Sequence, residues 1–311
     1  MKIFHSILDF ESPHKTIVTL GTFDGVHIGH KKIIDRLVAH SDSGHESLIL
    51  TFFPHPRMVL QEGSDIKLLN TIYEKSKLLD ALGLDNLVIH PFDEEFSRLT
   101  AEEFVKNILV DRFHIHKIII GHDHRFGRNR TANINDLILF GEQYGFEVEQ
   151  ISSQEINAVS VSSTKIRKAL ENGEIDLANA YLGYDYFLTG TVTRGKQLGQ
   201  TIGFPTANLE IPEPYKLIPK RGVYVVRSFI HGKIVHGMMN IGCNPTVNGT
   251  QQSVEIHYFD FDEDLYDRQI SVSLLHWIRP EQKFESVELL KEQLAKDKAV
   301  SLTFIENEKQ L

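Results

Sequence analysis

The sequence is poor in the features that mark secreted and membrane proteins. Its 311 residues include one cysteine, Cys243, so no disulfide can form within the chain, as is usual in a reducing compartment. No uncharged run approaches the ~18 residues of a membrane span. The first residues, interrupted by His5, Asp9 and Glu11, lack the apolar core of a signal peptide. We therefore expect a cytoplasmic protein without a membrane partner.

Basic residues are also few. The 33 Lys and Arg against 42 Asp and Glu give a net charge of −9, which argues against a general affinity for nucleic acid through a basic surface. Hydrophobic residues make up 41% and charged residues 24% of the chain, as in an ordinary globular protein. A chain of this length suits two domains.

The first half alternates strand-like and helix-like segments. Short apolar, β-branched runs predict strands, and runs with apolar residues on one helical face predict helices. Thr100 and Glu103 have the spacing of a capping box at one helix start. This rhythm predicts a parallel sheet with helices on both faces. The predicted strands are 15–20, 47–53, 86–90, 116–121 and 146–151, and the predicted helices are 31–40, 72–83, 100–110, 134–145 and 162–173.

The rhythm changes in the second half, where short strands with glycine, proline and asparagine between them predict a small barrel. Residues 285–305 close the chain as a helix that we expect to pack on its own domain. The boundary divides the chain into domains 1–183 and 184–311. The predicted strands are 187–195, 222–230, 233–242, 253–261 and 269–278.

The segment LGTFDGVHIGH, residues 20–30, is a glycine-rich turn with two histidines and no lysine. It follows a predicted strand and enters a helix that should start near Gly29. Ligands of open α/β sheets bind at this edge, beside helix N-termini that attract phosphate. His27 and His30 lie across one helical turn, so both can donate hydrogen bonds to phosphate oxygens as a nucleotidyl group transfers. Two surface histidines on a turn are the alternative.

A second motif, VSSTKIR at 161–167, places helix-capping hydroxyls one turn before Arg167, which can hold an anion bidentately. An ordinary capped helix is the alternative. Together the motifs resemble the signatures of the HxGH nucleotidyltransferase superfamily, in which this helix and its arginine close over a triphosphate. The resemblance implies catalytic roles for His27, His30 and Arg167, and ATP contacts from Gly21, Phe23, Asp24, Gly25, His27, Gly29, His30, Ser163, Thr164 and Arg167.

The second half resembles flavokinases in the segments GKQLGQTIGFPTANLEIP, NIGCNPT and VEIHYFDFDEDLYD. The chain as a whole therefore resembles the bacterial bifunctional riboflavin kinase/FMN adenylyltransferases, also called FAD synthetases. The resemblance implies a Rossmann-like nucleotidyltransferase domain, then a six-stranded flavokinase barrel with a C-terminal helix. It implies small-molecule partners only: riboflavin, FMN and ATP, with FAD as product and Mg²⁺ as cofactor. We expect a monomer or weak homo-oligomer.

The resemblance also assigns the kinase and flavin residues. Thr206 and Asn208 hold Mg²⁺ as hard oxygen ligands, and Glu255 is the base for the ribityl hydroxyl proton. An ordinary turn is the alternative for the PTAN segment, residues 205–208. A solvated residue on an edge strand is the alternative for Glu255. The implied kinase ATP contacts are Gly195, Lys196, Gly199, Gly203, Pro205, Thr206 and Asn208, and the implied flavin contacts are Phe52, Pro54, Asp123, Phe126 and Glu255.

Two further patterns are weaker evidence for a binding site. GTVTRGKQ at 190–197 nearly matches a phosphate-binding loop, but Gln197 replaces the Ser or Thr that binds Mg²⁺, and the segment alternates like a strand. Four histidines suggest zinc, but His114 and His116 should precede a strand that His122 and His124 follow, and no cysteine supports them.

The chain departs from the family pattern at His124, Ala132, Tyr184, Asp185, Gln200 and Asp267. Two other hypotheses stay open at this point. One is a paralogue that keeps a single activity, and the other is a flavin-binding regulator that does not consume ATP.

Overall fold

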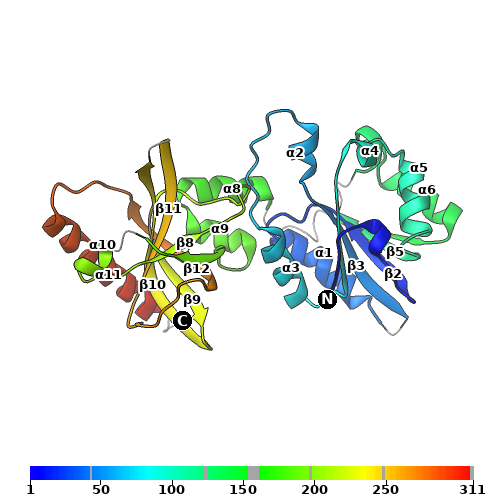
Figure 1. The fold of residues 1–311 in the computed structure, drawn as a ribbon. Helices are drawn as coiled ribbons and strands as arrows, with labels where there is room; N and C mark the ends of the chain where they lie inside the picture. The colour runs from blue at the N-terminus through cyan, green and yellow to red at the C-terminus, as the bar shows by residue number, and fades with distance from the viewer. Residues whose placement is uncertain (43, 122–124, 153–160, 196–197, 247–248, 309–311) are drawn as a thin grey trace. The chain divides into compact units, whose positions relative to one another are not determined.

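The computed structural model describes the chain except residues 43, 122–124, 153–160, 196–197, 247–248 and 309–311. The chain forms two compact units, Met1–Ser163 and Thr164–Leu311 (Figure 1). The predicted domains therefore differ from the compact units in one segment, 164–183, which the sequence reading placed with the first domain.

The first unit is built on a six-stranded sheet in the order β1-β4-β3-β2-β5-β6, with every neighbouring pair parallel. The chain extends the sheet from β2 first to one side and then to the other, so β2 and β5 flank the switch point where open α/β sheets bind ligands. The strands are β1 Lys2–Phe4, β2 Lys15–Leu20, β3 His45–Phe52, β4 Asn86–His90, β5 Ile115–Gly121 and β6 Glu147–Ile151.

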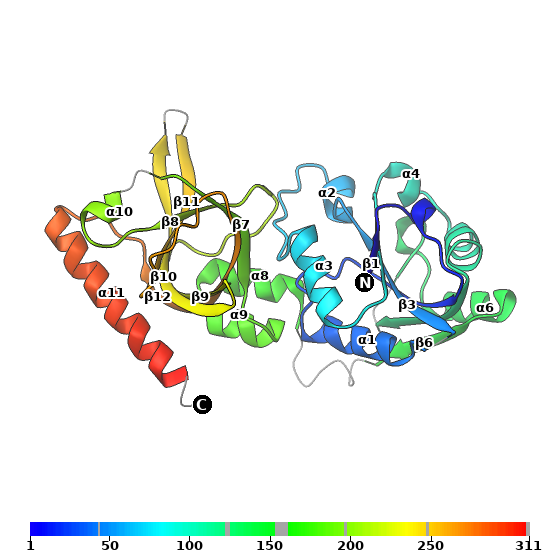
Figure 2. The same cartoon turned by 60° about the horizontal axis from the view of Figure 1, so that its bottom comes forward.

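Helices cover both faces of this sheet (Figure 2). On one face Ile34 and Leu37 of α1 pack on Ile17 and Ile119. The opposite face, with Val18 and Ile118, is covered by the π-helical turn Phe104–Val110 and by α6. The helices are α1 Ile28–Ala39, α2 Pro56–Leu60, α3 Ile72–Ala81, α4 Glu94–Ser97, α5 Ala101–Glu103 and α6 Ile134–Tyr144, with 3-10 turns at Ile7–Asp9 and Arg128–Arg130.

Sequence signals fix several of these helix starts. The predicted capping box of Thr100 and Glu103 is present, and a second box joins Thr71 and Glu74 at α3. Each box satisfies two backbone N–H groups that a helix start otherwise leaves without partners.

The second unit is a closed antiparallel barrel in the order β10-β11-β8-β7-β12-β9. The sheet class and the six-stranded barrel were both predicted. The long helix α11 runs along the outside of the barrel (Figure 2) and packs on β10, β12 and β9. The elements are α8 Ser163–Asn172, α9 Ile175–Leu182, β7 Phe187–Thr193, α10 Leu198–Thr201, β8 Ala207–Glu210, β9 Gly222–Ile230, β10 Lys233–Thr246, β11 Gly249–Tyr258, β12 Gln269–Pro280 and α11 Val287–Glu308.

Helices α8 and α9 group with the barrel for a physical reason. The Asn179 side chain on α9 donates to the Leu274 carbonyl at 2.9 Å and accepts from the Tyr186 N–H at 2.8 Å. The Lys220 N–H donates to the Leu170 carbonyl of α8 at 3.0 Å. These bonds join both helices to barrel strands and loops.

Among the helices of the described residues, none is long and apolar enough to cross a membrane.

Two candidate active sites

The glycine-rich turn begins where β2 ends, at the switch point of the sheet. Phe23, Gly25 and Val26 have φ values of 45°, 89° and 39°, a left-handed region that suits glycine and strains the other two residues. The turn reverses within a few residues and enters α1 at Ile28, with His27 as the N-cap. The predicted contact residue Gly21 begins the turn, and Gly29 lies at the start of α1, so the helix begins where the sequence placed it.

The two histidines stack on each other. The His27 Nδ1 accepts the His30 backbone N–H at 3.4 Å, and the ring centroids are 3.7 Å apart with planes inclined by 16°. The His30 ring also lies 5.1 Å from the Phe23 ring. Because Nδ1 of His27 is an acceptor, its proton is on Nε2, which is thus a donor.

Burial keeps both imidazoles neutral. It lowers the pKa of His27 to about 4 from 6.5, against the opposing effect of the Asp24 carboxylate. Burial lowers the pKa of His30 well below 6.5, and His27 and Lys75 lower it further. The Nδ1 atom of His30 is buried and has no hydrogen-bond partner among the described residues. A buried polar atom of this kind calls for a partner that the protein does not supply.

Asp24 ties the turn to the rest of the first unit. It is 1% exposed, and its Oδ1 accepts the Leu69 N–H at 2.9 Å. Its carbonyl accepts a hydrogen bond from the Ser163 hydroxyl at 2.8 Å. A residue of the second signature motif therefore contacts a residue of the first. The remaining predicted residues of that signature, Thr164 and Arg167, lie on α8 in the second unit.

Two of the predicted flavin residues of the first unit, Phe52 and Phe126, fall within an aromatic cluster. Phe52 lies 5.5 Å from Phe92 and 5.2 Å from Phe96, measured between ring centroids. Phe96 continues through Phe104 to Phe126. Phe92 and Phe96 were not among the predicted site residues, although their segment, PFDEEF, resembles the family pattern of this domain. Pro54 follows Phe52 after one residue, and Asp123 lies outside the described residues.

The barrel brings the predicted kinase residues together by strand register. Glu255 on β11 is opposite Asn208 on β8 and opposite Asn240 on β10. The flanking Val254 and Ile256 are buried, so Glu255 points to the outer face of the barrel. The edge-strand alternative is wrong, because β11 pairs on both sides. The alternation along β11 instead reflects a strand with one face toward the barrel interior and one toward the outside.

A cavity of about 240 Å³ lies on this outer face. Thr206, Glu255 and Gly199 of the predicted set line it, beside the N-terminal half of α11. Five polar residues that also line it were not predicted, since nothing in their local patterns marks them: Asn240, His257, Arg279, Glu281 and Gln282.

The phosphate-facing loop approaches β8 closely. A Cβ on Gly195 would be 2.1 Å from the Asn208 amide nitrogen, and a Cβ on Gly199 would be 2.2 Å from the Phe204 carbonyl oxygen. Only glycine fits at these two positions. The Pro205 carbonyl is 2.8 Å from His257 Nδ1, which fixes the PTAN turn against β11. Gly203 closes the turn with a φ of 83°, and Lys196 lies outside the described residues.

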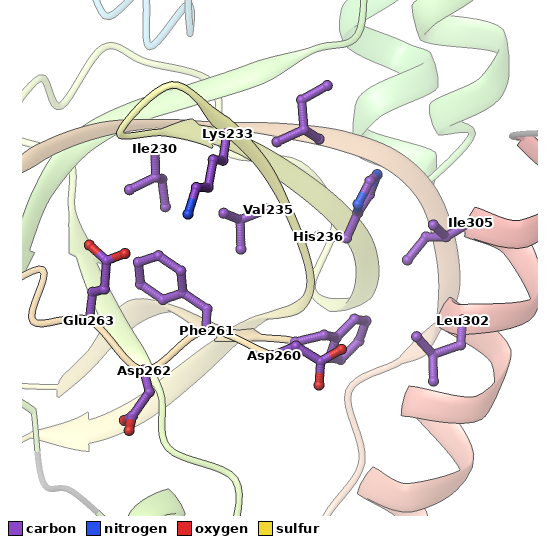
Figure 3. A pocket seen from close by; sticks show the side chains of 12 residues that line it. Ile230, Lys233, Val235, His236, Asp260, Phe261, Asp262, Glu263, Leu302 and Ile305 are labelled. Carbon is purple, nitrogen blue, oxygen red and sulfur yellow. The ribbon is translucent and has the colours of Figure 1, made fainter.

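A larger cavity of about 390 Å³ lies elsewhere on the barrel, between the β9–β10 hairpin, the loop after β11 and the C-terminal half of α11. Figure 3 shows Lys233, Phe261 and Glu263 around it. None of the predicted site residues lines it. The volume of a cavity therefore does not by itself identify the predicted kinase site.

The four-histidine pattern does not assemble in the part of the chain that can be described. His114 precedes β5, but His116 lies within it, a correction to the expected placement of both before the strand. His122 and His124 lie outside the described residues. Among the residues that are described, no group of three or more His, Cys, Asp or Glu side chains could hold a metal ion.

Four departures from the family pattern have local contacts or conformations that the structure shows. Asp185 forms an ion pair with Arg227 at 2.5 Å. Asp267 stands in the left-handed region with a φ of 62°, where a glycine is usual. Ala132 is buried and exchanges backbone hydrogen bonds with Phe126. Tyr184 packs against Phe187.

Fold and sites together define a nucleotidyltransferase unit joined to a flavokinase unit. Comparisons with known families agree: residues 9–165 match the FAD synthetase family model, and residues 182–305 match the riboflavin kinase model. The chain belongs to the family of bifunctional riboflavin kinase/FMN adenylyltransferases.

Relatives with that name cover nearly the whole chain. The protein of Buchnera aphidicola is 38% identical over 96% of both chains, and that of Listeria monocytogenes is 37% identical over 93% of this chain and 92% of its own. The Escherichia coli protein is 35% identical over 93% and 92%. A crystal structure titled a macrolide-efflux protein from Streptococcus pneumoniae has a TM-score of 0.86 at 29% identity, covering 96% of this chain and 98% of that one.

Proposed function

We propose that the two activities of this enzyme reside in separate sites, each in its own compact unit. The barrel cavity transfers the γ-phosphoryl group of ATP to riboflavin and makes FMN. The turn at the switch point transfers the adenylyl group of a second ATP to FMN and makes FAD with release of pyrophosphate. The observation that carries this proposal is that the histidine turn and Ser163 lie in the first unit, whereas Thr206, Asn208 and Glu255 lie in the second.

In the first unit, an FMN phosphate oxygen attacks the α-phosphorus of ATP, and the bond to pyrophosphate breaks. No protein nucleophile is needed. His27 and His30, neutral and stacked, direct N–H groups at oxygens where charge accumulates in the transition state. The unpartnered Nδ1 of His30 supports a ligand or ordered water at this point. Ser163, whose hydroxyl donates to the Asp24 carbonyl, is the proposed contact from the second signature within this unit. Arg167, on α8 in the second unit, stays a prediction from the signature alone.

In the second unit, Glu255 accepts the proton of the ribityl 5′-hydroxyl as that oxygen attacks the γ-phosphorus. Asn208 and Asn240, opposite it on both neighbouring strands, keep the carboxylate in a polar row. The apolar lining of the cavity, including Phe204, Met238 and Leu294, suits a flat aromatic ring system.

The residues present fit a magnesium ion. Thr206 and Asn208 supply a hydroxyl and an amide oxygen, the hard donors this ion prefers, and the missing side chain of Gly195 leaves room over the Asn208 amide. When bound, the ion would neutralise charge on the transferring phosphate.

Fragments of the chain test the separation of sites. Residues 164–311 should convert riboflavin to FMN with ATP and Mg²⁺, and should form no FAD when FMN is supplied, whereas the full chain forms both. FAD from this fragment would contradict the proposal. Comparing residues 184–311 tests the boundary: if the functional boundary follows the predicted domains, the shorter fragment keeps kinase activity, with lower stability because the Asn179 hydrogen bonds to the barrel are lost.

A further inference from the structure

The histidine turn has no lysine of its own, but the fold brings one to it from α3. Lys75 is 3% exposed, although lysine is almost never buried to this extent without a partner. Its ammonium donates to the carbonyl oxygen of Thr22 at 2.7 Å. Thr22 follows Gly21 and precedes Phe23, the first residue of the turn with a positive φ.

The contacts around Lys75 form a small framework beneath the turn. The Thr22 carbonyl also accepts the hydroxyl of Thr51 at the end of β3, at 3.2 Å. The buried Asp24 carboxylate accepts from the backbone N–H of Leu69, just ahead of α3. Two elements, β3 and α3, therefore hold the carbonyl that precedes the strained part of the turn.

The charged and titratable groups that face Lys75 are those of the site itself. Asp24 lies on the turn and favours the charged ammonium. His30 on α1 is affected by the lysine charge, and by its neighbour His27. Glu74, on the same helix, is committed to the α3 capping box.

We infer that Lys75 is a positioning residue of the adenylyltransferase site, which holds the turn at Thr22 and so fixes the backbone from which the histidines aim their donors. This inference rests on the proposed role of the histidine pair. The lysine charge also opposes protonation of His30, in addition to burial, which is the larger cause.

A lysine in this place makes the site sensitive to alkali. Burial lowers the pKa of Lys75 to about 8. Above that pH the neutral amine keeps a weaker hydrogen bond to Thr22, since charge-assisted hydrogen bonds are roughly twice as strong as neutral ones. Arginine at this position stays charged throughout.

The test follows FMN adenylylation by the full chain with supplied FMN and ATP, from about pH 4 to about pH 10. Lys75→Met should lower kcat about tenfold or more. It should also move the acid limb to higher pH, because His30 protonates more readily without the cation. Lys75→Arg should keep activity and move the alkaline limb upward from about 8. Lys77→Met, an exposed lysine of the same helix, is the matched control and should change neither.

Three results would overturn the inference. The first is a Lys75→Met variant with the wild-type rate and pH profile. The second is a Lys75→Arg variant with an unmoved alkaline limb. The third is loss of folded structure by circular dichroism in both variants, which would make the lysine purely structural. The His30→Ala variant distinguishes failure of the Lys75 inference from failure of the proposed function. If adenylylation survives His30→Ala, the histidine pair is not the adenylyltransferase site.

Discussion

The two sites proposed for this chain differ in how the backbone builds them. The proposed adenylyltransferase site is an irregular turn with three positive φ angles, two stacked neutral imidazoles and a buried lysine from a distant helix. The proposed kinase site is a row of polar side chains on the outer face of regular strands, placed by register. An irregular turn gives directed donors without net charge, whereas a strand face presents a carboxylate that can take a proton. The comparison predicts that each site fails by a different route.

The largest effect is expected at Glu255 on the barrel. Glu255→Gln keeps the shape of the side chain and its strand register, but removes the proton acceptor. FMN formation from riboflavin should fall by about a hundredfold or more, measured by chromatographic separation of riboflavin, FMN and FAD.

Adenylylation of added FMN in the same variant serves as the control and should not change. Kinase activity at the wild-type level would mean that Glu255 is only a polar residue on the barrel surface.

His30→Ala should have the next largest effect, in the other unit. Removing a preorganised transition-state donor typically costs about 3 kcal/mol, on the order of a hundredfold in rate. We expect that loss in FAD formation from FMN, with riboflavin phosphorylation unchanged. Normal FAD synthesis by this variant would remove the histidine pair from the mechanism and erase the contrast between the two sites.

The buried imidazoles should also make the first unit acid-sensitive. In the unfolded chain His27 binds a proton near pH 6.5, but in the folded unit only near pH 4. The unfolded state therefore binds more protons between these values, and stability falls as pH falls. From pH 7 to pH 5 the loss from His27 is about 2 kcal/mol, and His30 adds to it in the same direction.

Urea unfolding at the two pH values measures this loss. Circular dichroism follows both units, and the fluorescence of Trp277, the one tryptophan of the chain, follows the barrel. His27→Asn keeps a helix-capping acceptor but does not titrate, so it should reduce the pH dependence of the first unit. An equal pH dependence in this variant would show that His27 is not the acid-sensitive group.

The contrast between the sites also explains what could be predicted from sequence. Periodicity located the five longer parallel strands, and missed β1, whose three residues are too few to show a pattern. The histidine turn and PTAN were found because their residues are consecutive. Residues that reach a site from a distant part of the chain were not found. Three consecutive polar residues in an amphipathic helix predict a solvent-exposed face, but Glu74, Lys75 and Ser76 are buried.

Strand order in the barrel is the second feature that could not be predicted from the sequence. Asn240 and Arg279 line the kinase cavity only because β10 and β12 close around it, and sequence alternation does not specify which strands are neighbours. Alternation around Glu255 likewise could not distinguish an edge strand from a closed barrel. The change of rhythm near residue 183 placed the 164–183 segment with the first domain, whereas its hydrogen bonds join it to the barrel.

A smaller effect is expected at Gln200 on α10, where an arginine is common in the family pattern. Arginine offers a charged, forked donor to ATP oxygens, and glutamine a neutral one. Gln200→Arg should lower the ATP Michaelis constant of the kinase step several-fold and leave adenylylation unchanged. Gln200 is exposed and does not line the cavity, so superimposable ATP titrations would mean that the side chain does not reach the nucleotide.

The smallest effect concerns stability of the barrel unit alone. Asp267 has a φ of 62° and donates its N–H to the Val192 carbonyl at 2.9 Å. Glycine relieves the left-handed strain but has more freedom to lose on folding. Since strain in this region is roughly 1–2 kcal/mol, Asp267→Gly should stabilise the unit by about 1 kcal/mol or less. Asp262→Gly, in the same loop without a positive φ, has no strain to relieve and should destabilise it. Opposite shifts in the Trp277 unfolding midpoint, at unchanged rates of FMN formation, would separate backbone strain from chemistry. Equal losses would mean that Asp267 is not strained.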